Sequence, residues 1–280
     1  MSNSLKTTLL LGLLTGLLLW AGEALGGSQG LVIALGVAVV MNFGSYWFSD
    51  RLVLRMYRAQ PLEEPQAPEL FRMVRELTTA AGLPMPKICL IPSESPNAFA
   101  TGRDPEHAVV AVTAGLTRLL NREELRGVVA HELGHVHNRD TLISAIAATL
   151  AGVVTMLGRL AYWGALFGGR RADDDDGGPL SALVMMIVAP LAAALIQMAI
   201  SRSREFGADA FAARVTHDPF SLASALEKIA VGCQRVPLPA GPATAHLFIM
   251  NPLRGSWMSS LFSTHPPTEE RIRRLRSMTV

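Results

Sequence analysis

Long apolar stretches alternate with polar segments along this chain, and each of the four stretches approaches the length of a membrane helix. They cover residues 9–21, 31–48, 141–157 and 180–200. A hydrocarbon layer about 30 Å thick requires roughly 20 apolar helical residues, so the first stretch crosses it only if residues 5–25 are helical. The pattern therefore predicts two membrane hairpins, formed by residues 1–50 and 141–201.

Two of these stretches also fit another interpretation. The first follows Lys6 and precedes Ala24 and Gly26, which is typical of a cleavable signal peptide as well. The third continues past Gly158 and Arg159 to Phe167, and the interruption by Arg159 is also compatible with a buried helix of a soluble domain. The fourth carries no charged residue between positions 180 and 200 and is the clearest membrane segment.

Basic residues flank the apolar stretches unevenly, and this asymmetry predicts an orientation. Lys6 precedes the first stretch, Arg51 follows the second and Arg202 follows the fourth. The positive-inside rule places such flanks in the cytoplasm. We therefore expect the polar segments 51–140 and 202–280, and both termini, on the cytoplasmic side.

Periodicity within the polar segments predicts a small α+β domain. Apolar positions at helical spacing predict a helix over 68–81 that Gly82 ends. Short strands are expected at 87–91, 97–101 and 107–113, the last two joined as a hairpin. Further helices are expected at about 202–214 and 220–231, and from Pro267 or Thr268 onward.

Composition supports membrane segments and argues against two other classes of protein. Half of the residues are apolar, only 17% are charged, and the mean hydropathy is +0.31, which is unusual for a soluble enzyme. The net charge of +2 gives no reason to expect a nucleic-acid partner. Cys89 and Cys233 lie far apart in the sequence, so we expect no disulfide framework and a reducing compartment.

One segment of the chain carries a metal-binding pattern. Residues 127–140 read GVVAHELGHVHNRD, in a helix for which Asn121 and Glu124 form a predicted capping box. His131 and His135 share one helix face at this spacing, where both imidazoles can reach one Zn²⁺. Glu132 lies beside them and can act as a general base toward water on the metal.

The pattern requires a third protein ligand from elsewhere in the chain. Thr141 stands where the HExxHxxGxxH pattern would place a histidine, and His137 lies about 200° around the helix, toward the surface. The segment SREFGAD offers Glu205 as a ligand and Asp209 as an acceptor for the second N–H of a ligating histidine. The alternative is a pair of acids on a helix surface.

The combined motifs resemble the HtpX-type membrane zinc metallopeptidases. HELGH and SREFGAD are separated by a long apolar hairpin, with NAFATG before them and STHPPTEERI after them. The resemblance covers almost the whole chain. The related CAAX prenyl endopeptidases share these motifs but have longer chains and more spans.

This resemblance implies a fold and a function. We expect a mainly α membrane protein with four transmembrane helices and a cytoplasmic α+β gluzincin-like metalloprotease domain containing a small β-sheet. The implied activity is zinc-dependent endopeptidase cleavage of damaged or misassembled membrane proteins, at the cytoplasmic face of a bacterial inner membrane. One zinc ion per chain, polypeptide substrates and the lipid bilayer are the implied cofactor and partners.

The resemblance also implies residue roles. His131, His135 and Glu205 would bind zinc, Glu132 would be the base, and Asp209 would hold His131. His265 and Arg271 would stabilise the tetrahedral oxyanion, and substrate backbone would pair by β-augmentation with Asn97, Ala98, Phe99 and Ala100.

Simpler structural roles remain open for the strand at 97–100 and for the pair His265 and Arg271. The strand could be a packed turn, His265 a helix cap and Arg271 a member of a surface ion pair.

Two rival functions remain open for the whole chain: a prenyl-peptide processing protease, and a non-catalytic scaffold with a structural metal. A structural zinc site would have four protein ligands, whereas the sequence offers three and an intact Glu132.

Overall fold

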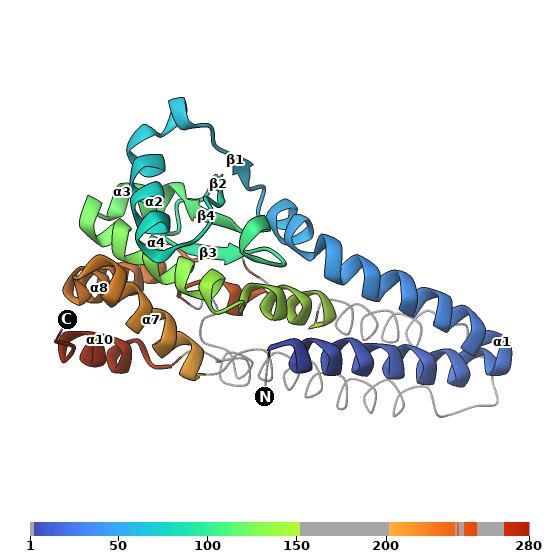
Figure 1. Ribbon diagram of the computed structural model, residues 1–280. Helices are drawn as coiled ribbons and strands as arrows, with labels where there is room; N and C mark the ends of the chain where they lie inside the picture. The colour runs from blue at the N-terminus through green and yellow to red at the C-terminus, as the bar shows by residue number, and fades with distance from the viewer. Residues whose placement is uncertain (1–2, 152–201, 239, 241–243, 251–265, 280) are drawn as a thin grey trace.

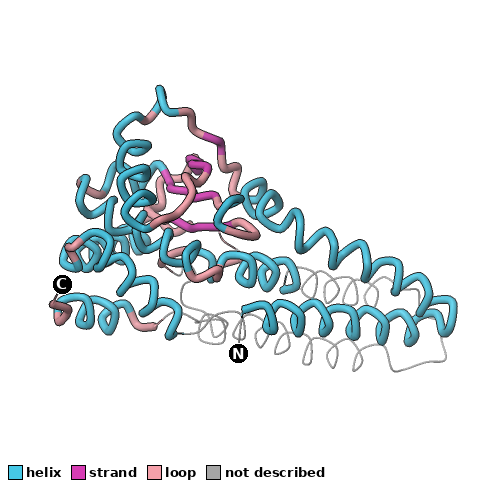
Figure 2. Tube along the Cα trace, viewed as in Figure 1, coloured by secondary structure: helices cyan, strands magenta, loops and turns pink. Residues whose placement is uncertain are grey.

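A long helical hairpin projects from a body of helices packed around a small mixed sheet (Figures 1 and 2). The computed structural model describes residues 3–151, 202–238, 240, 244–250 and 266–279. This part of the chain confirms a mainly helical protein with a small β-sheet.

The hairpin is formed by α1 (Asn3–Met56), which reverses direction at Gly26 and Gly27. Gly27 has φ of 56°, a left-handed conformation that glycine adopts without steric cost. Its two arms approach closely, because a Cβ on Gly30 would lie 2.0 Å from the carbonyl oxygen of Gly22. Glycine at this turn therefore allows both the reversal and the contact.

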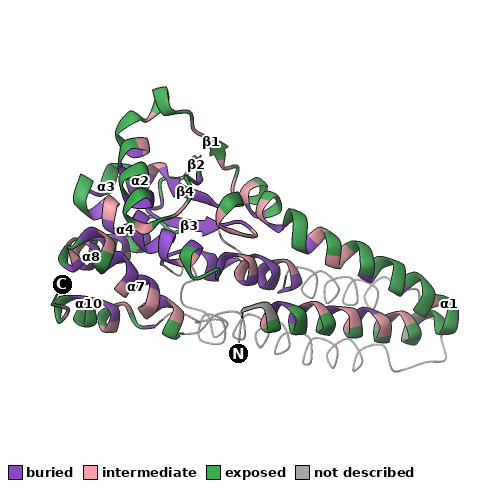
Figure 3. Cartoon of the chain, in the orientation of Figure 1, coloured by how far each residue is buried: buried purple, intermediate pink, exposed green. Residues whose placement is uncertain are grey.

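The second arm has the character of a membrane helix. Among the described residues, Gly26–Met56 is the helix long and apolar enough to cross a bilayer, and Leu5–Trp20 and Thr141–Ala151 are shorter apolar helices. Val32 and Val40 expose 69% and 70% of their surface, and exposed residues line this arm (Figure 3). The predicted segment 180–200 lies outside the described residues, so four spans remain a prediction.

The first arm of α1 packs against the helix that continues from the HELGH segment. Leu10 and Leu14 are buried with Ile143 and Ile146 in one apolar cluster, and Ala38 of the second arm joins them. The N-terminal hairpin is thereby fixed to the start of the second predicted membrane hairpin.

The sheet has four strands in the order β1-β2-β4-β3, with bounds Gln60–Pro61, Lys87–Ile91, Val109–Thr113 and Ala98–Thr101 in that order. β2 and β4 pair in parallel, whereas β1 and β3 pair antiparallel with their neighbours. The predicted β3–β4 hairpin is confirmed. Its second strand begins two residues later than predicted, because Pro105–His107 form a 3₁₀ turn (η2) capped by Asp104.

The remaining predicted helices are confirmed, with small changes at their ends. These are α2 (Pro68–Ala81), α4 (Arg122–His137), α7 (Arg202–Thr216), α8 (Pro219–Arg235) and α10 (Thr268–Arg276). Gly82 ends α2 with φ of 65°, and Asn121 and Glu124 form the expected capping box of α4. Four short elements were not predicted, because they are too short to show a period: β1, α3 (Ala114–Leu119) and the 3₁₀ turns η1 (Glu64–Gln66) and η3 (Ala245–Leu247).

Helix α4 is the centre of the body and contacts β3, α2, α7 and α8. Val128, Val129 and Leu133 on α4 are fully or almost fully buried and share one core with Leu222 and Leu226 of α8. Because α4 is covered on most sides, its polar residues His131 and Glu132 are enclosed by protein as well.

Glycine allows α7 to approach α4 closely. A Cβ on Gly134 would lie 3.0 Å from Cα of Ala208 and 3.2 Å from a ring carbon of Phe211. These are closer than ordinary van der Waals contacts, and one of the atoms belongs to the α7 backbone. The two helices therefore need glycine at this position to keep their separation.

We expect Gly134→Ala to destabilise the fold by about 1–3 kcal/mol, because overpacking at this contact exceeds the gain in helix propensity. Thermal unfolding in detergent would measure the change. Gly207→Ala on α7 is the matched control, since its Cβ would meet only the side-chain amide of Asn138 at 3.8 Å. Equal or higher stability of Gly134→Ala would contradict this account of the helix contact.

Candidate metal centre

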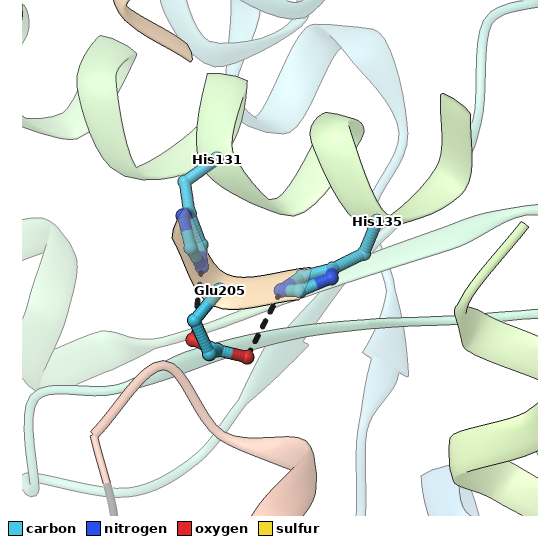
Figure 4. A group of neighbouring side chains, drawn as sticks. All are labelled: His131, His135 and Glu205. Atoms are coloured by element: carbon cyan, nitrogen blue, oxygen red, sulfur yellow. Dashed lines mark ion pairs between the residues drawn. The ribbon is translucent and has the colours of Figure 1, made fainter. Parts of the chain in front are cut away.

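Two helices bring three metal-binding side chains to one point inside the protein. His131 and His135 project from α4, and Glu205 approaches them from α7 (Figure 4). His131 is fully buried, Glu205 is 4% exposed and His135 is half-buried. Ligand atoms separated by about 70 residues in the sequence thus share one enclosed space.

The distances between these atoms suit a single ion. His131 Nε2 lies 3.7 Å from Glu205 Oε2, and His135 Nε2 lies 3.5 Å from Glu205 Oε1. The set of three donor atoms fits within 4.8 Å. A tetrahedral ion bound at about 2.0–2.1 Å keeps its ligand atoms about 3.4 Å apart, so two imidazole nitrogens and a carboxylate oxygen fit zinc in both spacing and chemistry.

Asp209 lies one turn beyond Glu205 and contacts the other ring nitrogen of His131. Its Oδ1 is 2.9 Å from His131 Nδ1. A carboxylate at Nδ1 fixes the tautomer of a histidine and leaves Nε2 directed toward the metal position. The i, i+4 spacing of Glu205 and Asp209 therefore directs both acids at the same imidazole from one face of α7.

Arg271 on α10 neutralises this group of acids from inside the protein. It is 2% exposed, and its Nε and Nη2 donate to the two oxygens of Asp209 at 2.9 and 2.7 Å. Its Nη1 donates to the carbonyl of Ile249 at 3.1 Å and lies 3.4 Å from Glu205 Oε2. The alternative that Arg271 forms a surface ion pair is wrong, because its partners are buried in the core.

The two histidines differ electrostatically because they face different neighbours. Burial and the charge of Arg271 lower the pKa of His131 to about 4. Burial also acts to lower the pKa of His135, but its hydrogen bond with Asp140 and the charge of Glu205 raise it to about 9. Although burial acts to raise the pKa of Asp209, Arg271 and His131 hold it at about 2. In the metal-free protein these neighbours thus favour the neutral imidazole of His131 and the protonated imidazole of His135, which has to lose one proton before its Nε2 can bind a metal.

Glu132 lies in the same pocket as His135 and Glu205. It is 2% exposed, and burial raises its pKa to about 7 against the opposing influence of His135. A carboxylate whose pKa lies near neutrality can both accept and return a proton. Ala100 of β3 and Thr141 line the pocket beside it.

The predicted substrate-binding strand contacts the site at one end and the protein core at the other. Asn97 is fully buried, and its amide donates to the carbonyl of Met250 at 2.9 Å. The carbonyl of Ala98 accepts from the amide of Ile249 at 3.0 Å. Phe99 is fully buried, and Ala100 is the residue of this strand that lines the pocket.

The other candidate residues lie away from the metal position or outside the described part of the chain. His137 is exposed and packs on the ring of Phe211, with 4.9 Å between ring centroids. His265 lies outside the described residues. Asp140, whose carboxylate lies 3.4 Å from His135 Nδ1, was not predicted, because no motif links that position to a ligand. Its distance of five residues from His135 was the one available signal.

Comparison with known proteins decides the family. Residues 64–279 match the family model described as peptidase family M48. The chain belongs to this family. It is therefore a metallopeptidase, and the M48 residues include every described side chain of the site.

The relatives of this M48 peptidase support the same conclusion over its full length. A protease HtpX homolog of Syntrophobacter fumaroxidans is 60% identical over 282 residues, covering 99% of this chain and 100% of the relative. A protease HtpX homolog of Thermococcus sibiricus is 54% identical over 278 residues, covering 98% and 95%. The expected resemblance and enzyme class are confirmed, and the chain is a membrane-bound M48 metalloprotease.

A solved structure supports the fold. The crystal structure of S. mikatae Ste24p superposes with a TM-score of 0.55 at 19% identity, covering 98% of this chain. This chain spans 65% of the length of that protein. At this identity the comparison concerns the fold alone.

We expect Arg271→Gln to lower the unfolding free energy of the metal-free protein by about 3–5 kcal/mol, because Asp209 would remain buried without its cation. Denaturant unfolding in detergent would measure this. Arg276→Gln, also on α10, is the control, because Arg276 pairs with Glu227 at 2.7 Å while half exposed. That change should cost no more than about 1 kcal/mol, and equal losses in the two variants would refute the assignment.

Proposed function

We propose that this membrane-bound M48 metalloprotease is a zinc-dependent endopeptidase that cleaves misfolded or damaged membrane proteins at the cytoplasmic face. The observation that carries the proposal is the convergence of His131, His135 and Glu205 within 4.8 Å, with Glu132 in the same pocket. Three protein ligands and an adjacent carboxylate are typical of a catalytic zinc site rather than a closed structural one.

Each side chain of the centre has a separate task in the proposed reaction. His131, His135 and Glu205 hold one zinc ion, which when bound supplies Lewis acidity for the attack of water on a peptide carbonyl. Glu132 accepts a proton from the attacking water and donates it to the leaving amine nitrogen. Its raised pKa, a consequence of burial, suits a group that must both take up and release a proton.

Arg271 supports this reaction by holding other groups in place. Its guanidinium bonds Asp209 and the Ile249 carbonyl, and its Nη2 also lies 3.3 Å from both ring nitrogens of His131. We therefore propose that Arg271 positions Asp209 and Glu205. The role in oxyanion stabilisation predicted for Arg271 together with His265 stays a prediction, because His265 lies outside the described residues.

Substrate is proposed to bind along β3 at the pocket. In the part of the chain that the structure describes, β3 is an edge strand of the sheet, and an extended polypeptide can pair with such an edge through backbone groups alone. The Ile249 amide already pairs with Ala98, so the proposed pairing is centred on Ala100. Recognition through the backbone tolerates many sequences, which suits a protease acting on unfolded chains.

The connection to the predicted membrane segments favours membrane-embedded substrates. Thr141, the first residue of the third apolar stretch, lines the pocket and follows His135 by six residues. α7 begins at Arg202, two residues after the end of the fourth stretch and three residues before Glu205. We propose that this hairpin spans a bacterial inner membrane and keeps the centre close to its cytoplasmic surface.

We expect Glu132→Gln to retain zinc and to lose cleavage by at least about 100-fold, because the amide cannot accept the proton. Zinc content and cleavage of unfolded casein by detergent-purified protein measure the two effects. Glu123→Gln, an exposed change on the same helix, should leave both at the wild-type level. Cleavage by Glu132→Gln at the wild-type rate would remove the proposed base and favour a different mechanism.

We expect Glu205→Ala to weaken zinc binding by at least about 10-fold, because it removes one of three ligands. Competition with a chromophoric chelator measures the affinity, and zinc bound as tightly as by the wild type would exclude Glu205 from the ligand set.

Substrate choice is tested on reconstituted wild-type enzyme. We expect cleavage of an unfolded membrane protein in the same vesicles and no processing of a farnesylated CAAX peptide. The reverse preference would favour the prenyl-peptide processing protease, and a zinc-loaded protein that cleaves neither would favour the scaffold.

A further inference from the structure

The metal centre contains a second carboxylate–histidine pair besides that of Asp209 and His131. Asp140 Oδ2 lies 3.4 Å from His135 Nδ1, on the side of the ring opposite to the nitrogen that faces Glu205. Asp140 is 4% exposed, so its charge is largely removed from water. A buried carboxylate is costly unless it is paired, and its contacts therefore indicate what it is there to do.

A turn directly after α4 brings Asp140 back to His135. After α4 ends at His137, Arg139 adopts φ of 56°, a left-handed conformation that is unfavourable for a residue with a side chain. The amide of Asp140 then donates to the carbonyl of His135 at 2.9 Å. This local turn places the Asp140 side chain against the imidazole of the same residue whose carbonyl it caps.

A cation from the other ligand helix holds the far side of the Asp140 carboxylate. Arg204 Nε lies 3.3 Å from Asp140 Oδ1, and the Arg204 side chain is 10% exposed. Arg204 directly precedes Glu205 on α7. Lys6 near the start of α1 also interacts electrostatically with Asp140 and Arg204. One carboxylate thus connects His135 on α4 with the neighbour of Glu205 on α7.

We propose that Asp140 is a positioning residue for His135, an inference that rests on the zinc site proposed above. By accepting a hydrogen bond from Nδ1–H, Asp140 selects the tautomer in which Nε2 carries the lone pair and faces Glu205. Its ion pair with Arg204 holds the Asp140 carboxylate, and through it the His135 ring, in a fixed position relative to α7. Each of the two histidines therefore has its own buried acid, provided by a different segment of the chain.

The direct test is zinc affinity in Asp140→Ala and Asp140→Asn, measured by chelator competition on full-length protein in detergent. Loss of such an outer partner weakens metal binding by about 10–100-fold, and we expect this for Asp140→Ala. Asp140→Asn keeps the shape and can still accept from Nδ1–H, so its loss should be smaller. Arg204→Gln, which leaves Asp140 without its ion pair, should also fall between Asp140→Ala and the wild type.

Glu124→Gln is the matched control for a merely structural effect. Glu124 lies on the same helix, is 3% exposed and pairs with Lys228 at 2.7 Å, but has no contact with the metal ligands among the bonds described. This variant should lose stability while binding zinc as tightly as the wild type. If Asp140→Ala behaves in the same way, with lower stability and unchanged zinc affinity, the proposal is overturned.

Cobalt substitution provides a readout that does not depend on activity. The visible spectrum of the Co²⁺-loaded protein reports the geometry of the ligands, and we expect it to change in Asp140→Ala and to stay unchanged in Glu124→Gln. An identical spectrum and affinity in all variants would overturn the role of Asp140. Failure of the zinc site itself would look different, because the wild-type protein would then bind neither ion.

Discussion

The close contact between α4 and α7 is the constraint on which the rest of this protein depends. Neither helix carries a complete metal site, because His131 and His135 lie on one and Glu205 on the other. Gly134 permits the approach by leaving no side chain between the helices. Since protein interiors are packed to high density, a small displacement here would be transmitted directly to the ligand atoms.

Because the ligands converge inside the protein, several charged side chains are buried together, and the structure stabilises them by pairing acids with a buried cation. Asp209 and Glu205 would repel each other in an apolar interior, but Arg271 contacts both. The same guanidinium bonds the Ile249 carbonyl, and Ile249 in turn pairs with β3. One buried cation thereby links α7, α10 and the edge of the sheet, so the C-terminal helix belongs to the centre although it supplies none of the proposed ligands.

The centre is also continuous with the segments predicted to lie in the membrane. The first arm of α1 packs on the helix Thr141–Ala151, and that helix follows the turn in which Asp140 contacts His135. A protease arranged in this way has its proposed zinc ligands and its membrane attachment on adjoining pieces of chain. Substrates held in the same bilayer would meet the pocket at a short distance, which physically motivates the proposed preference.

The sequence alone determined the local features of this protein. Helical spacing placed His131 and His135 on one face, the Asn121 cap fixed the start of α4, and Gly82 fixed the end of α2, because these features depend on residues only a few positions apart. The need for a third ligand and the i, i+4 spacing of Glu205 and Asp209 on a second helix suggested both acids as partners, but their positions in the sequence gave no distance to the histidines.

Only the tertiary structure decided which side chains share the centre. Arg271 could be read as a surface residue until the packing of α10 buried it beside Asp209, and Asp140 carried no motif at all. Asn97 belonged to the expected substrate strand, yet packing directs its amide to Met250. Arg271 and Asn97 have partners more than 60 positions away, and such partners are chosen by the packing of whole helices and strands, which local periodicity does not encode. Asp140 lies only five residues from His135, but the left-handed turn at Arg139 that brings them together carries no motif. The ion pair of Asp140 with Arg204 joins α7 to this turn.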